Sequence, residues 1–412
     1  MPLTENDRDS ASTTAHPHGY VRLLRVFFVR VCVVVALGVV LMLAVELFAY
    51  KRYEHGGADV LEPAVKLDLV ESGSAADREY WKEFDQANKV VYHQYSLWRR
   101  APYQGQMISI DAEGVRRSLH TRCDDKTFTI WTFGDSVMWG AGTTDADTIP
   151  SHIAQDYENA GRPVCIVNYA EKGWCNSQEV VALIELLKHA ARKPDIVLFY
   201  DGGTEAFAAY QSGQADVHSN YGAFKSFLDN YGKTQRAGFS YLEQTNTYRL
   251  LRNISARNLF HHNAEASHQE QFDADTLSTD VVENYTKNIA VVDLLAKQYG
   301  FRPVFAWYPN LAVGHKELTA YEQQVLRFQD EPFPNLASFY RAVYAKSSEI
   351  KTPEFHDLEG LVDDQKDSLY IGLSHMKPEG TRVVADRLFN LLEGKGILSA
   401  PAPHPDSVTH SN

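Results

Sequence analysis

The sequence predicts an α/β protein with three layers, in which helices cover both faces of a central parallel sheet, preceded by one transmembrane helix. Short apolar runs recur along the chain at 127–133, 163–168, 195–200 and 303–308. Strands that are covered on both faces have such near-continuous apolar sequences. Amphipathic helical patterns separate the runs, and this alternation favours a parallel sheet between two layers of helices. In such a sheet the functional site lies at the carboxyl ends of the strands.

The helical patterns between the apolar runs have recognisable ends. One apolar stripe follows helical spacing within 180–187, and a second within 285–296. Gly300 follows the second stripe directly, as a glycine that ends a helix does. Pro378 suits the first turn of a last helix, whose apolar residues include Val384 and Leu388. The chain therefore alternates strands and helices from residue 127 to residue 395.

Residues 26–50 form an apolar stretch that only Arg30 and Glu46 interrupt. A spanning helix needs about 20 mostly apolar residues, and charges near its ends can reach the membrane surface. Three arginines (Arg22, Arg25 and Arg30) precede the uncharged run 31–45, and two basic residues (Lys51 and Arg52) follow it. This slight bias favours an N-terminus in the cytoplasm and a main domain in the periplasm or another extracytoplasmic space. A cleaved signal peptide is the alternative, but no small-residue cleavage site follows the stretch. We predict a single-pass anchor.

The pattern divides the chain into five parts. They are a cytoplasmic arm (1–25), the transmembrane anchor (26–50), a stalk and N-terminal extension (51–126), the α/β domain (127–395) and a disordered tail (396–412). The aromatic and basic segment 92–119 is expected to pack on the domain as an extra edge. Residues 204–280 form a long insertion, and insertions of this size are usually lids or small subdomains.

Charge and residue spacing exclude two classes of function. The formal net charge is −13, from 53 acidic and 40 basic side chains. A protein that binds nucleic acid needs a basic face to replace counterions, so we expect no nucleic-acid partner. The chain has no CxxC pair and no zinc-binding spacing. We therefore predict neither a metal nor a cofactor.

The cysteines leave two readings open. A disulfide between Cys165 and Cys175 is compatible with their short separation and would suit an oxidising compartment. Cys165 also lies within an apolar strand-like run, which favours a buried free thiol. The second reading is the expectation.

Two residues, Ser136 and His375, lie where α/β proteins carry their functional groups, at the carboxyl ends of the strands. Ser136 follows the first strand of the domain, and Gly134 before it permits a tight turn. A serine hydroxyl becomes a nucleophile only beside a base, which is most often a histidine. Of the 16 histidines, His375 lies just before Pro378, in the loop that opens the last helix. Serine after the first strand and histidine before the last helix are the candidate catalytic pair.

This arrangement resembles the SGNH hydrolase superfamily, which includes the GDSL esterases and lipases. The resemblance covers roughly 127–395 without the insertion and implies a flavodoxin-like three-layer fold. Its blocks match, in chain order, as Gly134-Asp135-Ser136, then Gly173, then Gly202-Gly203-Thr204-Glu205, and finally Gly372-Leu373-Ser374-His375. The resemblance implies that Ser136 is the nucleophile and His375 its base. It also implies an oxyanion hole formed by the backbone N–H groups of Ser136 and Gly173, with Thr204 as a third donor.

Two positions depart from the family pattern. Thr204 stands where the family has an asparagine in the oxyanion hole, and its hydroxyl can donate only one hydrogen bond. Gly372 stands where the family has the aspartate that orients the histidine. Asp367 is a candidate replacement, and a backbone carbonyl is another. The sequence alone therefore predicts a Ser–His dyad.

The resemblance implies serine-dependent ester chemistry, as an ester hydrolase or an O-acyltransferase. Membrane-anchored members are associated with cell-surface polysaccharides, so we expect an acylated, in particular acetylated, carbohydrate as substrate. Trp139, Trp174 and Trp307 could stack on sugar rings, although tryptophans near strands more often belong to the core. The alternative is an inactive SGNH-fold protein that binds polysaccharide or a membrane assembly partner. The two departures favour it, and the presence of both Ser136 and His375 favours an enzyme.

Overall fold

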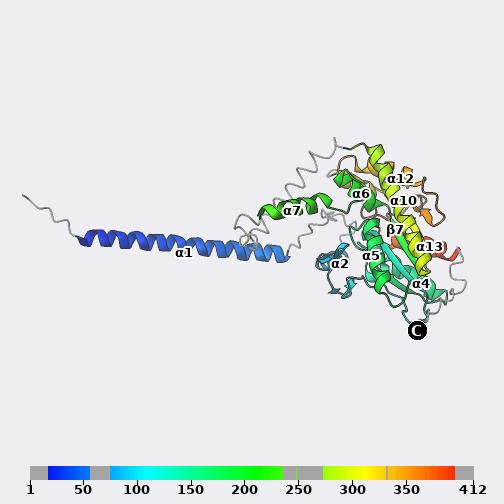
Figure 1. The fold of residues 1–412 in the computed structure, drawn as a ribbon, viewed down its shortest axis with the longest axis horizontal. Coiled ribbons are helices and arrows are strands. Elements are labelled where there is room, and N and C mark those ends of the chain that lie inside the picture. Colours follow the sequence, from blue (N-terminus) through cyan, green and yellow to red (C-terminus); the bar gives the residue numbers. More distant parts are fainter. Residues whose placement is uncertain (1–16, 56–74, 235–246, 248–271, 331–332, 395–412) are drawn as a thin grey trace, which may run out of the picture. The chain divides into compact units, whose positions relative to one another are not determined.

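The computed structural model describes residues 17–55, 75–234, 247, 272–330 and 333–394 (Figure 1). Residues 1–16 of the predicted arm, the predicted tail 396–412 and most of 235–271 lie outside the described residues. The chain divides into two units, of which one comprises 1–56 with 239–252 and the other comprises the rest. Each unit is described by itself below.

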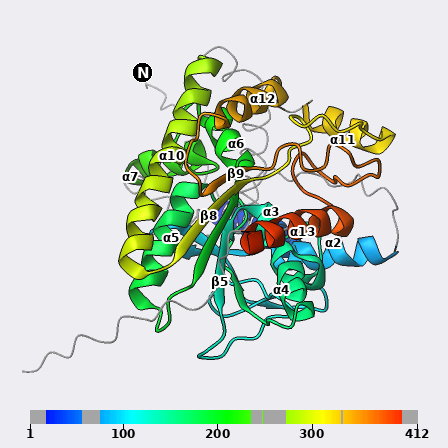
Figure 2. The ribbon, with the colours of Figure 1, turned by 90° about the vertical axis from the view of Figure 1, so that its right-hand side faces the viewer.

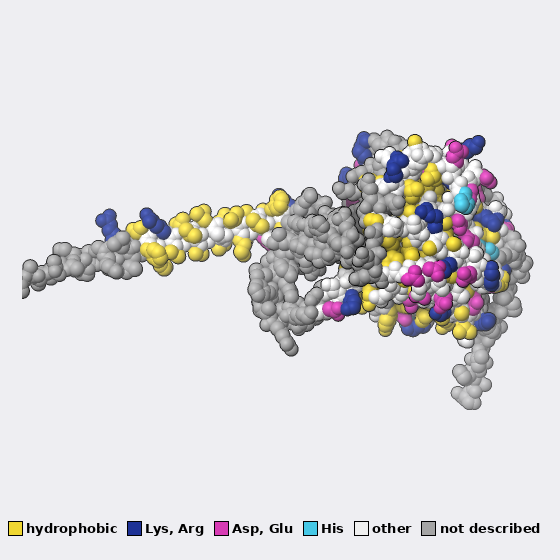
Figure 3. Space-filling view, turned by 90° about the horizontal axis from the view of Figure 1, so that it is seen from above, with side chains coloured by type: hydrophobic (Ala, Val, Ile, Leu, Met, Phe, Trp, Pro, Cys, Tyr) yellow, Lys and Arg dark blue, Asp and Glu magenta, His cyan; other side chains and the backbone are white. Residues whose placement is uncertain are grey.

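The first unit contains one long helix, α1 (Pro17–His55). Its surface is lined with apolar side chains, as the space-filling view of this helix shows (Figure 3). The segment Arg25–Lys51 is long and apolar enough to cross a membrane, and a signal sequence would meet the same test. Glu46, one of its two interrupting charges, accepts hydrogen bonds from the backbone N–H and the hydroxyl of Thr247 at 2.8 and 2.7 Å. The predicted apolar helix is therefore present.

The second unit is built on a five-stranded sheet in the order β6-β5-β7-β8-β9, and all of its strand pairs are parallel. The strands are β5 (Thr129–Gly134), β6 (Cys165–Asn168), β7 (Ile196–Asp201), β8 (Arg302–Trp307) and β9 (Phe355–Asp357). The predicted central parallel sheet is confirmed, and four strands fall on the predicted apolar runs. The short edge strand β9 was not predicted, because it is only partly buried and carries no apolar run.

Helices cover both faces of this sheet (Figure 2). Alternate strand residues point to opposite faces, so Ile130 and Leu198 belong to one apolar core and Trp131 and Phe199 to the other. The first core is closed by α3 (Ser136–Trp139), α4 (Ile149–Asn159), α11 (Ala320–Asp330) and α13 (Pro378–Gly394). The second is closed by α5 (Asn176–His189), α6 (Gly203–Ser212), α10 (Ala274–Tyr299) and α12 (Leu336–Ser347). The three-layer fold is thereby confirmed.

The helix ends agree with the sequence patterns. Gly300 adopts a left-handed conformation with φ of 79° and closes α10, as predicted. Helix α13 begins at Pro378, also as predicted. The predicted insertion 204–280 overlaps α6, the helix α7 (Tyr221–Thr234) and the start of α10. A 3-10 turn, η1 (Asp145–Asp147), leads into α4.

The segment before the domain folds onto it. It contains α2 (Ala75–Ala87) and two antiparallel hairpins, β1 (Val90–His93) with β2 (Leu97–Arg100), and β3 (Tyr103–Gln104) with β4 (Ser109–Ile110). Glu83 of α2 accepts the backbone N–H groups of Gln106, Met107 and Ile108. Tyr80 accepts the N–H of Gly142, just beyond the nucleophile turn, at 2.9 Å. We call residues 75–119 the N-terminal extension, and it is part of the same folded unit as the sheet.

A disulfide joins Cys123 to Cys165, so both expectations for Cys165 were wrong. Cys165 lies on the edge strand β6, and the chain before β5 runs alongside this edge. Arg122 donates its backbone N–H to Val164 at 2.9 Å, and Thr121 accepts the N–H of Ile166 at 2.7 Å. This pairing brings two residues 42 positions apart into contact. Cys175 remains a buried free thiol.

Candidate active site

Ser136 and His375 meet at the carboxyl end of the sheet. The Oγ of Ser136 lies 2.8 Å from Nε2 of His375, across a separation of 239 residues. Ser136 is the first residue of α3, directly after β5, and only 8% of it is exposed. If Nε2 accepts the hydroxyl proton, the imidazole carries its own proton on Nδ1, which is the form a general base requires.

Glycine is required at the turn that presents the nucleophile. Gly134 has φ of 150°, and a Cβ there would lie 2.6 Å from the carbonyl oxygen of Tyr200. Asp135 then begins the helix, because its carboxylate accepts the N–H of Val137 at 2.7 Å. The strand therefore ends in a sharp turn that holds the hydroxyl of Ser136 toward His375.

The Asp135 side chain also accepts hydrogen bonds from two hydroxyl groups. Its carboxylate accepts hydrogen bonds from the hydroxyls of Thr204 and Tyr308, at the ends of β7 and β8. Burial raises the pKa of Asp135, while these hydrogen bonds and the nearby His375 act in the opposite direction. A hydroxyl has one proton to donate, so Thr204 is engaged with Asp135 here and does not offer that proton to an oxyanion. Tyr308 was expected only as a strand residue, and nothing in its local sequence marks this contact.

Two backbone N–H groups beside the dyad have no acceptor among the described residues. They belong to Ser136, at the start of α3, and to Gly173, in the loop after β6. Glu171 in that loop donates its backbone N–H to the carbonyl oxygen of Gly134 at 3.0 Å. The loop is therefore tied to the nucleophile turn, and both N–H groups remain available to a ligand.

The loop that carries His375 is closed by backbone contacts. Ile371 donates its N–H to the carbonyl oxygen of His375 at 2.9 Å, and Tyr370 bridges Met376 in antiparallel fashion. Asp367 is exposed, and among the described residues it makes no contact with His375. A Cβ on Gly372 would lie 3.3 Å from Nδ1 of His375. The position where the family has its aspartate thus faces the ring nitrogen that such an aspartate would bind.

Two buried carboxyl groups, Glu179 and Asp201, and the partly buried Glu205 lie behind this site. Glu179 of α5 and Asp201 of β7 are almost completely buried, and Asp201 accepts hydrogen bonds from Asn176 and Tyr285 at 3.0 and 2.8 Å. Burial, reinforced by the Asp201 charge, raises the pKa of Glu179 well above its usual range. Burial also raises the pKa of Glu205 to about 7. A protonated Glu179 can donate its proton to Asp201, so the pair is stable as one acid and one carboxylate.

Replacing Glu179 with glutamine should reduce the loss of stability with rising pH. The folded-state pKa of Glu179 is raised, so its stabilising proton is fully retained below the unfolded pKa and is lost as pH rises toward the folded pKa. Glutamine keeps a donor toward Asp201 and has no proton to lose. Between pH 5 and pH 8 the melting temperature of the variant should fall less than that of wild type, by roughly 4 °C. Glu283→Gln, at an exposed position of α10, is the control. Equal falls in both variants would contradict a protonated pair.

Trp139, Trp174 and Trp307 are core residues, as tryptophans near strands more often are. Their exposed fractions are 1%, 0% and 0%, and all three belong to the two cores. The interpretation of these tryptophans as a sugar-stacking surface was therefore wrong. Their large rings fill the space between the helices and the sheet, where they bury more of their surface than they would in an open groove.

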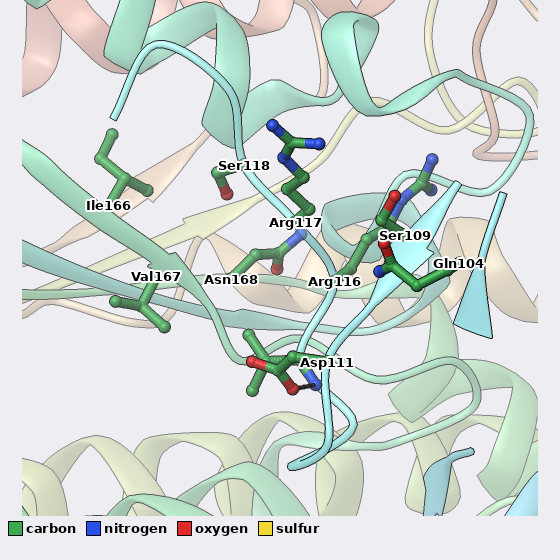
Figure 4. Close-up of a pocket in the computed structure, with 10 residues that line it drawn as sticks. Gln104, Ser109, Asp111, Arg116, Arg117, Ser118, Ile166, Val167 and Asn168 are labelled. Carbon is green, nitrogen blue, oxygen red and sulfur yellow. Dashed lines mark hydrogen bonds between the residues drawn. The ribbon is translucent and has the colours of Figure 1, made fainter. Parts of the chain in front are cut away.

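A separate cavity of about 250 Å³ lies along the edge strand β6 (Figure 4). Its walls come from the hairpin β3–β4, the segment 115–118 and the end of β6, and neither Ser136 nor His375 lines it. Arg116 lines the cavity, but its guanidinium is already bound by other groups. It pairs with Asp145 and donates hydrogen bonds to the carbonyl oxygens of Trp139, Gly140 and Thr143. The cavity thus lies outside the dyad, although Arg116 braces the turn that follows the nucleophile.

No family model and no curated protein matches this sequence. Solved structures do match it. A lipase/acylhydrolase from Enterococcus faecalis is 12% identical, with a TM-score of 0.34, and the match covers 65% of this chain and 96% of that one. A lipolytic protein of the G-D-S-L family from Veillonella parvula is 12% identical, with a TM-score of 0.33 and coverages of 64% and 96%. An acetyl xylan esterase is 11% identical, with a TM-score of 0.32 and coverages of 64% and 100%. Each of these three proteins is named as a lipolytic protein, an acylhydrolase or an esterase.

Proposed function

We propose that this protein is a serine-dependent ester hydrolase or O-acyltransferase. The observation that carries the proposal is the 2.8 Å contact between Nε2 of His375 and Oγ of Ser136, at the carboxyl end of the sheet. Ser136 attacks the ester carbonyl while His375 takes the hydroxyl proton. His375 then gives this proton to the leaving alcohol, which leaves an acyl group on Ser136. Water or a second alcohol, deprotonated by His375, releases the acyl group.

The backbone N–H groups of Ser136 and Gly173 are proposed to bind the oxyanion that forms in each step. Both lack an acceptor among the described residues, which is what a preorganised oxyanion hole requires. Thr204 acts differently from the asparagine that it replaces. Its hydroxyl binds Asp135 and so holds the nucleophile turn, and it is a positioning residue in this proposal.

The proposed substrate is an acylated carbohydrate outside the cytoplasm. The N-terminal helix Arg25–Lys51 supports attachment to a membrane, and the Cys123–Cys165 disulfide supports an oxidising compartment. The carbohydrate rests on the resemblance to membrane-anchored SGNH proteins that are associated with polysaccharides. Acetate is the acyl group that this resemblance favours.

Acetate release by the full-length protein in detergent tests this function. Acetylated oligosaccharides and p-nitrophenyl acetate are the substrates, and the Ser136→Ala protein is the blank. An unacylated oligosaccharide added as acceptor distinguishes transfer from hydrolysis, because transfer gives an acetylated product that mass spectrometry detects. Equal rates with wild type and blank would remove the enzymatic proposal.

A binding protein without activity is the second candidate, and Gly372 is the observation that favours it. The aspartate that orients the histidine in the family is missing at this position, where the chain has Gly372. If that absence ends catalysis, the protein would bind acetylated oligosaccharide without releasing acetate. Calorimetry with the same oligosaccharides, alongside the activity measurement, separates the two candidates.

Replacing Gly372 with aspartate should raise activity. A Cβ there would lie 3.3 Å from Nδ1 of His375, so the ring must shift by a few tenths of an ångström before an aspartate carboxylate can bind it and hold Nε2 toward Ser136. We expect kcat to rise about tenfold, as one added charge-assisted hydrogen bond allows. A carboxylate also favours the imidazolium, so the acid limb of the rate profile should move to higher pH.

Gly372→Asn is the matched control for this variant, since it adds a side chain of the same size without charge. Asparagine should leave the acid limb in place. If aspartate changes neither kcat nor the pH profile, another group already holds the ring of His375.

A further inference from the structure

The loop that carries Gly173 is a turn whose central peptide has one defined orientation. Trp174 donates its backbone N–H to the carbonyl oxygen of Glu171 at 3.2 Å, and Gly173 has φ of 76°. This hydrogen bond and a positive φ at the third residue are the features of a type II turn. The central peptide of the turn joins Lys172 to Gly173, so it contains the N–H proposed for the oxyanion.

The other end of that peptide is bound by Trp98 of β2. Its indole N–H donates to the carbonyl oxygen of Lys172 at 3.1 Å, in a buried environment. In a planar trans peptide, the C=O and the following N–H point in opposite directions. Fixing the Lys172 carbonyl therefore fixes the direction of the Gly173 N–H. We propose that Trp98 is a positioning residue, which holds the Gly173 N–H toward Ser136 from the N-terminal extension.

Neighbouring residues of β2 bind the rest of the turn. Arg100 donates its backbone N–H to the Glu171 carboxylate at 2.8 Å, and its guanidinium lies 3.4 Å from the same group. The guanidinium of Arg99 lies 4.6 Å from the ring centre of Trp174. Three of the four turn residues, Glu171, Lys172 and Trp174, thus contact this one strand. The N-terminal extension, which the motif blocks do not include, completes the active site in this proposal.

Trp98 is itself held rigidly enough for this role. It is 2% exposed, and its ring stacks on Phe224 of α7 with centres 6.0 Å apart. His218 contacts it edge-on at 5.9 Å. Replacing tryptophan with phenylalanine keeps an aromatic ring between these neighbours and removes the indole donor together with part of the ring volume, a loss of volume that a Trp-to-Phe control at another buried site shares. The role of Trp98 rests on the proposed ester chemistry, and its test must separate the two.

The test measures kcat and KM for p-nitrophenyl acetate with the full-length Trp98→Phe protein in detergent. Loss of an oxyanion donor lowers kcat by about 10² to 10³, and a donor that is only less well oriented should lower it about tenfold. KM should stay within about twofold, since the donor acts mainly on the transition state. Trp307→Phe is the control, because Trp307 is equally buried but its indole N–H has no acceptor among the described residues. Its kcat should match that of wild type.

A second variant tests the same peptide without touching Trp98. Gly173→Ala has room for its Cβ, whose nearest neighbours would be Trp98 at 3.7 Å and Ser219 at 4.0 Å. It acts through the positive φ, which alanine disfavours, so the central peptide should turn over and kcat should fall about a hundredfold. If wild type is active and both variants match it, the inference is wrong and the ester chemistry stands. If wild type neither hydrolyses the ester nor reacts with a fluorophosphonate, the proposed function fails and the role of Trp98 falls with it.

Discussion

Replacing Ser136 with alanine should lower ester hydrolysis by roughly 10⁴-fold or more, to the rate of the buffer blank. The hydroxyl lies 2.8 Å from Nε2 of His375, so its removal takes away the group that this base would activate. The variant should still fold, because the Oγ atom that it lacks is not part of either apolar core. The melting temperature and the rate of ester cleavage, measured on the same detergent preparation, check both statements.

Ser118→Ala is the matched control for that variant. Ser118 is 8% exposed, as Ser136 is, and its hydroxyl has no hydrogen-bond partner among the described residues. Its removal should leave the rate within about twofold of wild type, as expected for a group outside the reaction. Activity that persists in Ser136→Ala would exclude this serine as the nucleophile.

Replacing His375 with alanine should lower kcat by roughly 10³- to 10⁴-fold, because the serine then has no base to accept its proton. The remaining rate should rise with pH, since hydroxide can take over part of the proton transfer. KM should change little, because the ring is not expected to bind the substrate before the reaction begins. Steady-state kinetics between pH 6 and pH 10 test this result.

His152 of α4 supplies the control for the histidine. It is 8% exposed, neither ring nitrogen has a partner among the described residues, and burial lowers its pKa. His152→Ala should therefore retain the activity of wild type, with some loss of stability. A His375→Ala protein as active as His152→Ala would show that the 2.8 Å contact has no catalytic role.

The strands and helix ends that could be predicted from the sequence are those determined by the residues within or next to them. Four strands were found because residues buried on both faces leave a continuous apolar run. Helix α13 was found from Pro378, and the end of α10 from Gly300. Ser136 and His375 were predicted together because each follows a strand or precedes a helix at the same edge of the sheet. That placement needs no knowledge of distant contacts.

The contacts that the sequence could not predict join segments far apart in the chain. The Cys123–Cys165 disulfide depends on a segment that runs beside an edge strand, and no local pattern reports this path. Thr204 could be identified as a departure, yet its bond to Asp135 depends on how the ends of β5 and β7 meet. Trp98 lies 74 residues before the carbonyl that it binds. The contacts that support the site therefore form only when distant segments of the chain pack together in the folded protein.

Fluorophosphonate labelling of the full-length protein in detergent is the measurement that tests the central claim most directly. The reagent reacts with a serine only when a base activates its hydroxyl, and mass spectrometry of the peptides identifies the residue. We expect label on Ser136, no label in His375→Ala, and unchanged labelling in His152→Ala. A folded wild-type protein that takes no label, or takes it on another residue, would contradict the claim that Ser136 and His375 form a catalytic pair.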